Sequence, residues 1–317
     1  EWIGFLPGKR ESRRYVGGYM LKQQDLERAV EFEDIVGYGG WSMDDHNPWG
    51  FDTKEEPTIY HPVKSPYGIP YRCLYSVNIE NLMFAGRNIS ATHTALASTR
   101  VMATCGTLGQ AVGTAASIAV RDGLTPKEIY EKRISELQEK LQEDDCYLPG
   151  RRKKKNPLME RVQIISTEGD VNCLTDGIER TLDGEEHVWK APIGAEIQAR
   201  LPEGSLVKSV RFIFDSDINR DGWGDGLAEY RRYPMRCHVY LGQQPAVMPP
   251  ALIRGYEFWI RMGEEWVLWK KETENHKRLV DIPVNRPLCE IKMIPLDTWG
   301  QKEARIYRMD IMGTTAK

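Results

Sequence analysis

The pattern of hydrophobic positions changes about halfway along the chain. Before residue 150, apolar positions recur at helical spacing or cluster with glycine and alanine, and beyond residue 160 they alternate with polar positions. Spacings of three and four place apolar residues on one face of a helix, whereas a spacing of two places them on one face of a strand. The pattern therefore predicts an α/β region followed by an all-β region.

The clearest predicted helix begins after Thr125. This threonine suits the N-cap, Pro126 the first helical position, and Glu128 the position that completes a capping box. Spacings of four, three and four then place one apolar stripe on the helix: Tyr130, Ile134, Leu137 and Leu141. We expect an amphipathic helix that docks on its own domain.

Short alternating segments predict a β-sandwich of the jelly-roll type in the second half. Residues 289–293 and 307–311 each alternate between apolar and polar positions, and in 210–214 the apolar Val210, Phe212 and Phe214 share one face opposite Arg211 and Ile213. Residues 256–261 and 266–270 flank Met262-Gly263-Glu264-Glu265, which is a hairpin signal. Many short strands with turn signals between them are typical of a sandwich.

Between the two regions lies a basic run with proline and glycine at its ends, residues 149–157. Such punctuation with self-repelling charges predicts a linker between domains at 1–148 and 158–317. A nuclear-localisation or nucleic-acid-binding patch is the alternative. The net charge of −3 gives no reason to expect nucleic acid or an anionic membrane as partner.

Composition supports two packed domains. The 317 residues are 41% hydrophobic and 28% charged, which excludes a disordered chain. The longest mostly small and apolar run, residues 111–120, falls short of the ~20 residues that a membrane span needs. No signal peptide is visible, the first residue is Glu1, and the compartment stays unassigned.

The six cysteines lie too far apart for a C-x-x-C pair. Local spacing therefore gives no zinc or iron–sulfur site, and no metal ligands are assigned. Most of these thiols are expected to be buried as small hydrophobic groups.

A glycine-rich helix is predicted between residues 98 and 121. Each glycine inside a helix costs about 1 kcal/mol relative to alanine. Close packing on a sheet, another helix or a flat ligand would explain that cost. Residues 82–85 read as a buried strand that ends at Gly86, which suggests a crevice at the carboxyl end of a parallel sheet.

The stretch from Asn81 to Gly113 closely resembles the carboxy-terminal flavin motif of the FAD-dependent oxidoreductase family, whose relatives include heterodisulfide-reductase-A-like flavoproteins. The matching segments are 81–93, 98–105 and 108–113, and the resemblance extends upstream to Glu11-Ser12-Arg13-Arg14 and to Gly39-Gly40-Trp41 with Asp44 and His46. It covers residues 1–148. It implies an FAD in a domain of the two-dinucleotide-fold type.

The resemblance also implies which residues contact the cofactor. Gly86 and Arg87 would close around FAD, and the helix N-terminus near Thr104 would face the pyrimidine edge of the flavin, where a helix dipole stabilises negative charge. Arg100 would add a fixed cation; an ordinary surface ion pair is the alternative for both arginines. The full set of expected cofactor-binding residues is Gly86, Arg87, Asn88, Arg100, Thr104, Cys105, Gly106, Leu108, Gly109 and Gln110.

The chain departs from the family at the phosphate-binding turn. No G-x-G-x-x-G is present, because Gly37, Gly39 and Gly40 have the wrong spacing and Ser42 stands where the third glycine belongs. The α/β domain is therefore expected to be incomplete, the C-terminal part of a longer flavoprotein. We expect this chain alone to bind FAD poorly and to be inactive.

Two histidines are the candidate catalytic residues for hydride transfer between a small-molecule substrate and flavin. His46 follows Asp44 and Asp45, and His93 follows the flavin-proximal turn. His46 is the candidate general base or substrate-orienting group, and His93 a second polar group that faces the ring. For each, a solvated loop histidine is the alternative.

The second half resembles galactose-binding-like (discoidin-type) jelly rolls at Asp176-Gly177, Trp189 and residues 210–215 and 298–311. Carbohydrate is thus a candidate partner, with Trp223, Trp259, Trp266, Trp269 and Trp299 either as stacking platforms or as core. Residues 217–229 have the spacing of a calcium loop but lack glutamate at position 12, which favours an acidic turn. A non-enzymatic carbohydrate-binding protein is the alternative function, and a sandwich that only covers the flavin domain is a third.

Overall fold

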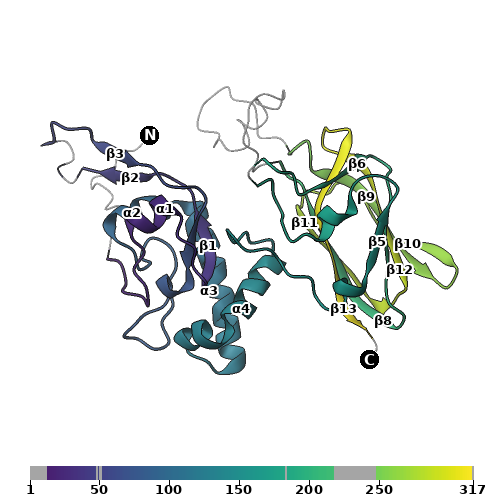
Figure 1. Ribbon diagram of the computed structural model, residues 1–317, viewed down its shortest axis with the longest axis horizontal. Coiled ribbons are helices and arrows are strands. Elements are labelled where there is room, and N and C mark those ends of the chain that lie inside the picture. The colour runs from purple at the N-terminus through teal and green to yellow at the C-terminus, as the bar shows by residue number, and fades with distance from the viewer. Residues whose placement is uncertain (1–12, 48, 50–51, 183, 218–247, 316–317) are drawn as a thin grey trace, which may run out of the picture. The chain divides into compact units, whose positions relative to one another are not determined.

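The computed structural model describes residues 13–317 except 48, 50–51, 183, 218–247 and 316–317. The chain divides into two compact units, Glu1–Arg151 and Arg152–Lys317. Figure 1 shows helices with short strands in the first unit and a sandwich of strands in the second. The α/β fold followed by an all-β sandwich is thus confirmed.

The first unit contains four helices and two antiparallel ribbons in its described part. The ribbons pair β1 (Ile35–Gly39) with β4 (Tyr67–Pro70), and β2 (Met43–His46) with β3 (Thr58–His61). The helices are α1 (Gln23–Arg28), α2 (His93–Thr99), α3 (Met102–Asp122) and α4 (Pro126–Glu143). A 3-10 turn, η2 (Tyr71–Cys73), follows β4.

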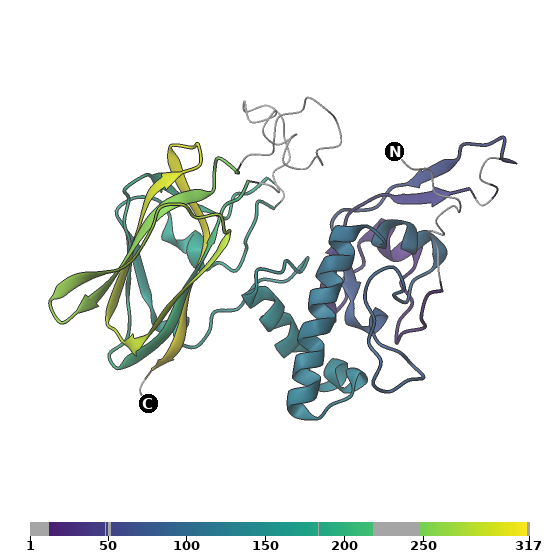
Figure 2. The ribbon, with the colours of Figure 1, turned by 180° about the vertical axis from the view of Figure 1, so that it is seen from behind.

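Helices α3 and α4 pack side by side, as Figure 2 shows from behind. The predicted capping box holds, since the Thr125 hydroxyl accepts from Glu128 N and the Glu128 carboxylate accepts from Thr125 N. Leu137 and Leu141 are fully buried, whereas Ile134 is only partly buried. The helical prediction is confirmed, with a buried stripe that is shorter than expected.

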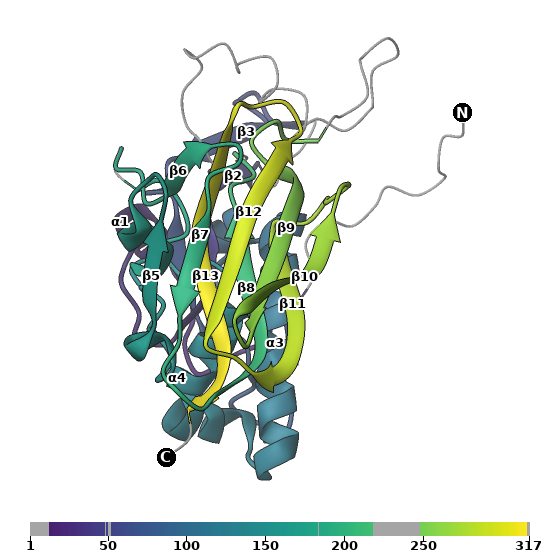
Figure 3. The ribbon, with the colours of Figure 1, turned by 90° about the vertical axis from the view of Figure 1, so that its right-hand side faces the viewer.

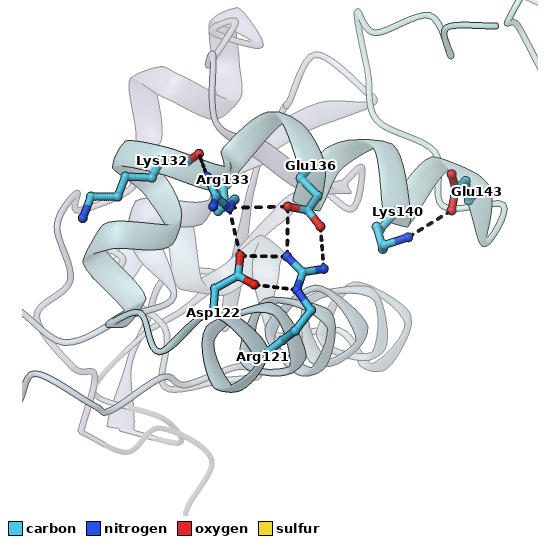
Figure 4. A network of polar contacts seen from close by, with 7 residues as sticks. All are labelled: Arg121, Asp122, Lys132, Arg133, Glu136, Lys140 and Glu143. Atoms are coloured by element: carbon cyan, nitrogen blue, oxygen red, sulfur yellow. Dashed lines mark hydrogen bonds and ion pairs between the residues drawn. The ribbon is translucent and has the colours of Figure 1, made fainter. Parts of the chain in front are cut away.

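A network of charges joins the C-terminal end of α3 to α4 (Figure 4). The Arg121 guanidinium contacts Asp122 at 2.6 Å and Glu136 at 2.7 Å, and Arg133 contacts Asp122 at 2.9 Å. These hydrogen bonds hold the pKa of the Asp122 carboxyl well below its usual range. The network links the last turn of α3 to α4 across the helix–helix contact.

An ion pair with a fully buried carboxylate joins two segments of the first unit. Asp34 is fully buried and accepts from Arg72 Nε at 2.9 Å, Arg72 Nη2 at 2.9 Å and Arg72 N at 3.0 Å. The Arg72 guanidinium also lies over the rings of Tyr19 and Tyr130, 5.5 Å and 5.0 Å from their centroids. Such a bidentate pair fixes both the distance and the orientation of the segments it joins.

The expected strand at residues 82–85 is wrong. Only one isolated bridge forms there, between Met83 and Tyr75, and Phe84 N donates to Leu74 O. The parallel sheet is likewise not found in the part of the chain that the structure describes, where both ribbons are antiparallel. Residues 82–85 contact the segment just after η2 and no named strand of a sheet. An apolar run therefore does not by itself determine which backbone segment it pairs with.

The second unit is a sandwich of two antiparallel sheets. One has the order β10-β9-β12-β7-β5 and the other β11-β8-β13-β6, and Figure 3 faces the first of them. The strands of the first are β5 (Gln163–Ser166), β7 (Ile197–Arg200), β9 (Ile253–Met262), β10 (Glu265–Glu272) and β12 (Glu290–Thr298). Those of the second are β6 (Trp189–Pro192), β8 (Ser205–Phe214), β11 (Leu279–Pro287) and β13 (Glu303–Thr315). Two 3-10 turns, η3 (Met159–Arg161) and η4 (Val171–Thr175), precede β6.

The predicted alternation builds the sandwich core. Phe212 and Phe214 of β8 and Phe258 of β9 are all fully buried. The predicted hairpin joins β9 to β10 with Glu265 opposite Met262. Trp189 is fully buried and donates its indole N–H to Glu168 O at 2.9 Å. Trp259, Trp266, Trp269 and Trp299 are partly exposed.

Part of the predicted basic linker belongs to the second unit. Lys153 is largely buried, pairs with Asp310 at 3.0 Å and donates its backbone N–H to Gly177 O. Its charge is therefore used inside the fold, which weakens the view of the run as a nucleic-acid patch.

Other expectations meet the structure unevenly. Among the described cysteines only Cys73 is fully buried and Cys289 is exposed, so the expectation of mostly buried thiols is wrong. The calcium-like loop from residue 218 and Trp223 lie outside the described residues. Among the described residues, no cluster of metal ligands is found, and no helix has the length and hydropathy to span a membrane.

Candidate functional site

The β2–β3 ribbon and the helix α2 bring the candidate catalytic residues near one another. Helix α2 packs against β2. His46, at the end of β2, lies with Nδ1 2.8 Å from Thr58 Oγ1 and with Nε2 3.2 Å from Arg100 Nη2. A guanidinium only donates, so Nε2 accepts from Arg100 and Nδ1 carries the proton directed at Thr58. While this contact lasts, His46 Nε2 cannot take a proton from a substrate.

His93 is the first residue of α2 and pairs with a carboxylate of β2. Its Nε2 lies 3.0 Å from Asp45 Oδ1, and 52% of the His93 side chain is exposed. An ionised carboxylate only accepts, so Nε2 donates to Asp45. A carboxylate partner of this kind fixes the tautomer and the orientation of an imidazole, as a catalytic base requires.

A buried polar chain holds α2 on the ribbon. Ser98 Oγ donates to Trp41 O at 2.5 Å and accepts from Tyr67 OH at 2.5 Å. Ser98 and Tyr67 are fully buried, and burial raises the pKa of Tyr67 well above its usual range. A Cβ on Gly39 would stand 2.3 Å from the Tyr67 hydroxyl, so only glycine fits there. These contacts set the positions of His93 and Arg100 at the two ends of α2.

The N-terminus of α3 is open in the way a flavin edge would need. Its N-cap, Val101, makes no side-chain cap, and the first N–H groups of a helix have no intrahelical partner. The predicted cofactor residue Thr104 is buried in this first turn. Burial raises the pKa of the Cys105 thiol, while the positive charge of Arg87 acts in the opposite direction.

One face of α3 carries the glycines and is exposed. A Cβ built on Gly106, Gly109 or Gly113 would meet no described atom within 4 Å. The same stripe begins at Met102, which is 90% exposed, and ends at Val120, which is 85% exposed. The expected explanation, close packing on a sheet or helix, therefore finds no partner for these glycines among the described residues.

The remaining predicted cofactor residues occupy different surroundings. Gly86 has φ +96°, a conformation that favours glycine. Asn88 O accepts from Tyr15 N at 2.9 Å. Leu108 is fully buried near Gly37, so its side chain faces the core, whereas Gln110 is exposed beside the glycine stripe.

Sequence reasoning missed the partners of the two histidines. Asp45 was noted only as a neighbour of His46, and Thr58, Ser98 and Tyr67 were not selected at all. The carboxylate before His46 is a signal that was available. Pairings across 48 and 31 residues, by contrast, leave no local trace in the sequence.

The described residues fit one edge of a flavin. An uncapped helix N-terminus supplies N–H donors and a positive dipole end. The open space beside Gly106 and Gly109, which a Cβ would fill, leaves room for a flat ring to approach the backbone.

Comparison with known structures gives neighbours for about half of the chain. One is the family 32 carbohydrate-binding module from Streptococcus pneumoniae EndoD, at 16% identity and a TM-score of 0.34, over 48% of this chain and 96% of that one. Another is the family 32 module from C. perfringens NanJ in complex with galactose, at 12% identity and a TM-score of 0.32, over 48% and 93%. A third is the family 32 module of AlyQ in complex with 4,5-unsaturated mannuronic acid. Its sequence identity is 12% and its TM-score is 0.31, and the match covers 47% of this chain and 93% of that one.

Comparison with protein families covers the first unit. No curated protein matches the chain. The family model described as FAD dependent oxidoreductase matches residues 1–141. The relation to heterodisulfide-reductase-A-like proteins stays a prediction. Residues 1–141 therefore match the family whose flavin motif the sequence resembles.

Proposed function

We propose that the first unit forms the part of an oxidoreductase active site that contacts one edge of the flavin and the substrate. The observation that carries this proposal is the N-terminus of α3, which has no side-chain cap and lies within the segment that matches the FAD dependent oxidoreductase family. When bound, FAD supplies the acceptor or donor of a hydride. The chain supplies the positive end of a helix, a fixed cation and two histidines.

In this proposal His93 moves the substrate proton. Oxidation of a C–H bond next to a hydroxyl or amine removes a hydride from carbon and a proton from oxygen or nitrogen. Asp45 holds the His93 ring and would stabilise its positive charge after it accepts that proton. His46 instead orients substrate together with Arg100, because its Nε2 already accepts from that guanidinium.

Rapid-reaction kinetics of flavin reduction in the full-length protein test these roles. His93→Ala should slow reduction about 10²–10⁴-fold, the usual contribution of a positioned base. His61→Ala, on the same ribbon at β3, is the matched control and should leave the rate unchanged. Equal rates for the wild type and His93→Ala would remove His93 from the mechanism.

A second candidate function, carbohydrate recognition, is favoured by the outer face of the five-stranded sheet. Lys292 Nζ of β12 lies 5.8 Å from the ring centroid of Trp259 and 5.0 Å from that of Trp266. Glu257 accepts from the Trp259 indole, and Arg261 pairs with Glu290 at 3.2 Å. Partly exposed indoles among polar groups suit sugar stacking and hydrogen bonding.

Binding of the whole chain to an immobilised glycan panel tests this second function. Trp266→Ala should abolish any binding seen with the wild type. Trp269→Phe is the matched control, because Trp269 packs against the sandwich core. Binding that survives Trp266→Ala would show that this sheet face is not the site.

A further inference from the structure

A pocket of about 520 Å³ lies next to the N-terminal end of α2. None of its lining residues belongs to α3. Its walls come from two stretches of the chain, residues 13–20 and 91–92. The residues that matter for its chemistry are Arg13, Arg14, Tyr15, Val16, Met20 and Thr92. The match to the oxidoreductase family includes this pocket, but nothing above gives it a role.

Backbone hydrogen bonds hold the two walls together. Tyr15 N donates to Asn88 O at 2.9 Å, Leu21 N to Ser90 O at 3.0 Å, and Thr92 N to Leu21 O at 2.8 Å. The Tyr15 ring also stacks on Phe84 with centroids 4.9 Å apart. The pocket is thus part of the fold of the first unit and does not depend on a side-chain rearrangement.

The lining combines positive charge with apolar surface. Two arginines stand at one end of the stretch, and no carboxylate is among the described residues that line the pocket. Val16 and Met20 are 56% and 41% exposed, so the lining offers apolar surface beside the arginines. A guanidinium pairs bidentately with a carboxylate, and the apolar wall suits a hydrocarbon body.

The pocket also adjoins a proposed catalytic residue. Thr92 lines it, and the next residue, His93, pairs with Asp45. A ligand held by its anionic end at Arg13 would lie in a pocket whose wall includes the residue next to His93 in the chain. Only a molecule with a charged end and an apolar body uses all of these features at once.

We propose that this pocket binds the carboxylate end of an organic-acid substrate, with the apolar part of that substrate against Val16 and Met20. The assignment rests on the proposed oxidoreductase function and adds its substrate class. The phosphates of FAD are the competing source of negative charge, but they would leave the apolar wall unused.

Binding of simple probes to the full-length protein, followed by calorimetry, tests the pocket without turnover. Hexanoate should bind, whereas neutral hexanamide and inorganic phosphate should bind at least about tenfold more weakly. Arg13→Gln should weaken hexanoate binding about tenfold, and Arg13→Lys should recover part of it. Arg28→Gln, which removes one exposed arginine from α1 outside the pocket, is the matched control and should have no effect.

The flavin content of the same variants separates the two sources of charge. Arg13→Gln and the double variant Arg13→Gln/Arg14→Gln should keep wild-type FAD content and a wild-type thermal transition. Loss of FAD in parallel with loss of anion binding, or phosphate binding tighter than hexanoate binding, would overturn the proposal in favour of the cofactor phosphates. Hexanoate affinity that is unchanged by Arg13→Gln would also overturn it.

These results distinguish this inference from the proposed function. If hexanoate binding depends on Arg13 but no substrate ever reduces the flavin, the anion pocket stands and the redox role falls. If the flavin is reduced by substrates and Arg13→Gln changes neither their KM nor hexanoate binding, the redox role stands and the pocket falls.

Discussion

The two units close their cores in different ways. The second unit packs two sheets over one apolar interior in which Phe212, Phe258 and Trp189 are fully buried. In its described residues, the first unit has two-stranded ribbons, an ion pair between the buried Asp34 and Arg72, and a long helix with an exposed glycine face. The described strands of the second unit pack their apolar faces against one another. The first unit leaves the glycine face of α3 exposed, and the composition of that face suits a ligand.

This difference teaches where to look for function. Exposed glycines in α3 cost helix stability and gain no packing among the described residues. Exposed Met102 and Val120 at the ends of the same stripe add apolar surface that contributes nothing to the described core. Among the described residues of the sandwich, the analogous candidates are partly exposed tryptophans on a sheet face, so chemistry is expected first in the first unit.

The largest effect should come from the sandwich core. Phe212→Ala should lower the free energy of unfolding of the second unit by about 3–5 kcal/mol, because it leaves a cavity. Hydrogen exchange measured unit by unit should show the loss in residues 152–317 and none in the first unit. Leu206→Ala, at a half-exposed position of the same strand, should change stability by at most about 0.5 kcal/mol. A loss of protection in both units would show that they unfold together.

The ion pair of Asp34 with Arg72 should matter less than the sandwich core. Asp34→Asn removes the charge of a fully buried carboxylate that accepts three hydrogen bonds, and the loss of such charge-assisted bonds costs about 1.5–3 kcal/mol. The matched control is Asp281→Asn, which breaks the exposed pair with Arg211 and should cost about 0–1 kcal/mol. Urea unfolding of both variants provides the comparison, and equal losses would mean that burial does not distinguish the two pairs.

A smaller effect of opposite sign is expected on the glycine face. Gly109→Ala should stabilise the first unit by up to about 1 kcal/mol, because alanine favours the helix and its Cβ meets no described atom. In the full-length protein the same change should lower the FAD content, since the methyl group occupies the space left for the ring. Higher stability with full FAD content would separate the glycine face from the cofactor.

The smallest effect concerns pH. Hydrogen bonds from Lys132 and from Thr125 lower the pKa of Glu128 to about 2. Because the folded pKa lies below the unfolded one, the stabilisation is present above the ordinary glutamate range and is lost as pH falls toward 2. Glu128→Gln should therefore show a weaker loss of α4 stability between about pH 4.5 and pH 2 than the wild type. Identical acid profiles by circular dichroism would contradict this.

Elements with local signals were predictable from the sequence. The capping box at Thr125 and Glu128 and the hairpin at residues 262–265 depend on neighbours a few residues apart, and both form as predicted. The sandwich followed from strict alternation, which burial on one face of a sheet enforces. The prediction of a strand at residues 82–85 was wrong, because a short apolar run does not show which backbone segment it will pair with.

The candidate site was predictable only in part. Its histidines and the glycine helix could be picked out by residue type and motif. The pairing of His93 with Asp45, the contact of Arg100 with His46 and the buried Ser98–Tyr67 chain join residues far apart in the sequence. Only the folded ribbon and helix bring these groups together.

The most direct test of the account is a crystal structure of the full-length protein with its flavin bound. We predict that the pyrimidine edge of the ring lies at the N-terminus of α3, near Thr104, with Arg87 beside it and Gly106 and Gly109 along its face. A ring bound elsewhere, with Arg87 and the first turn of α3 in solvent, would contradict the account.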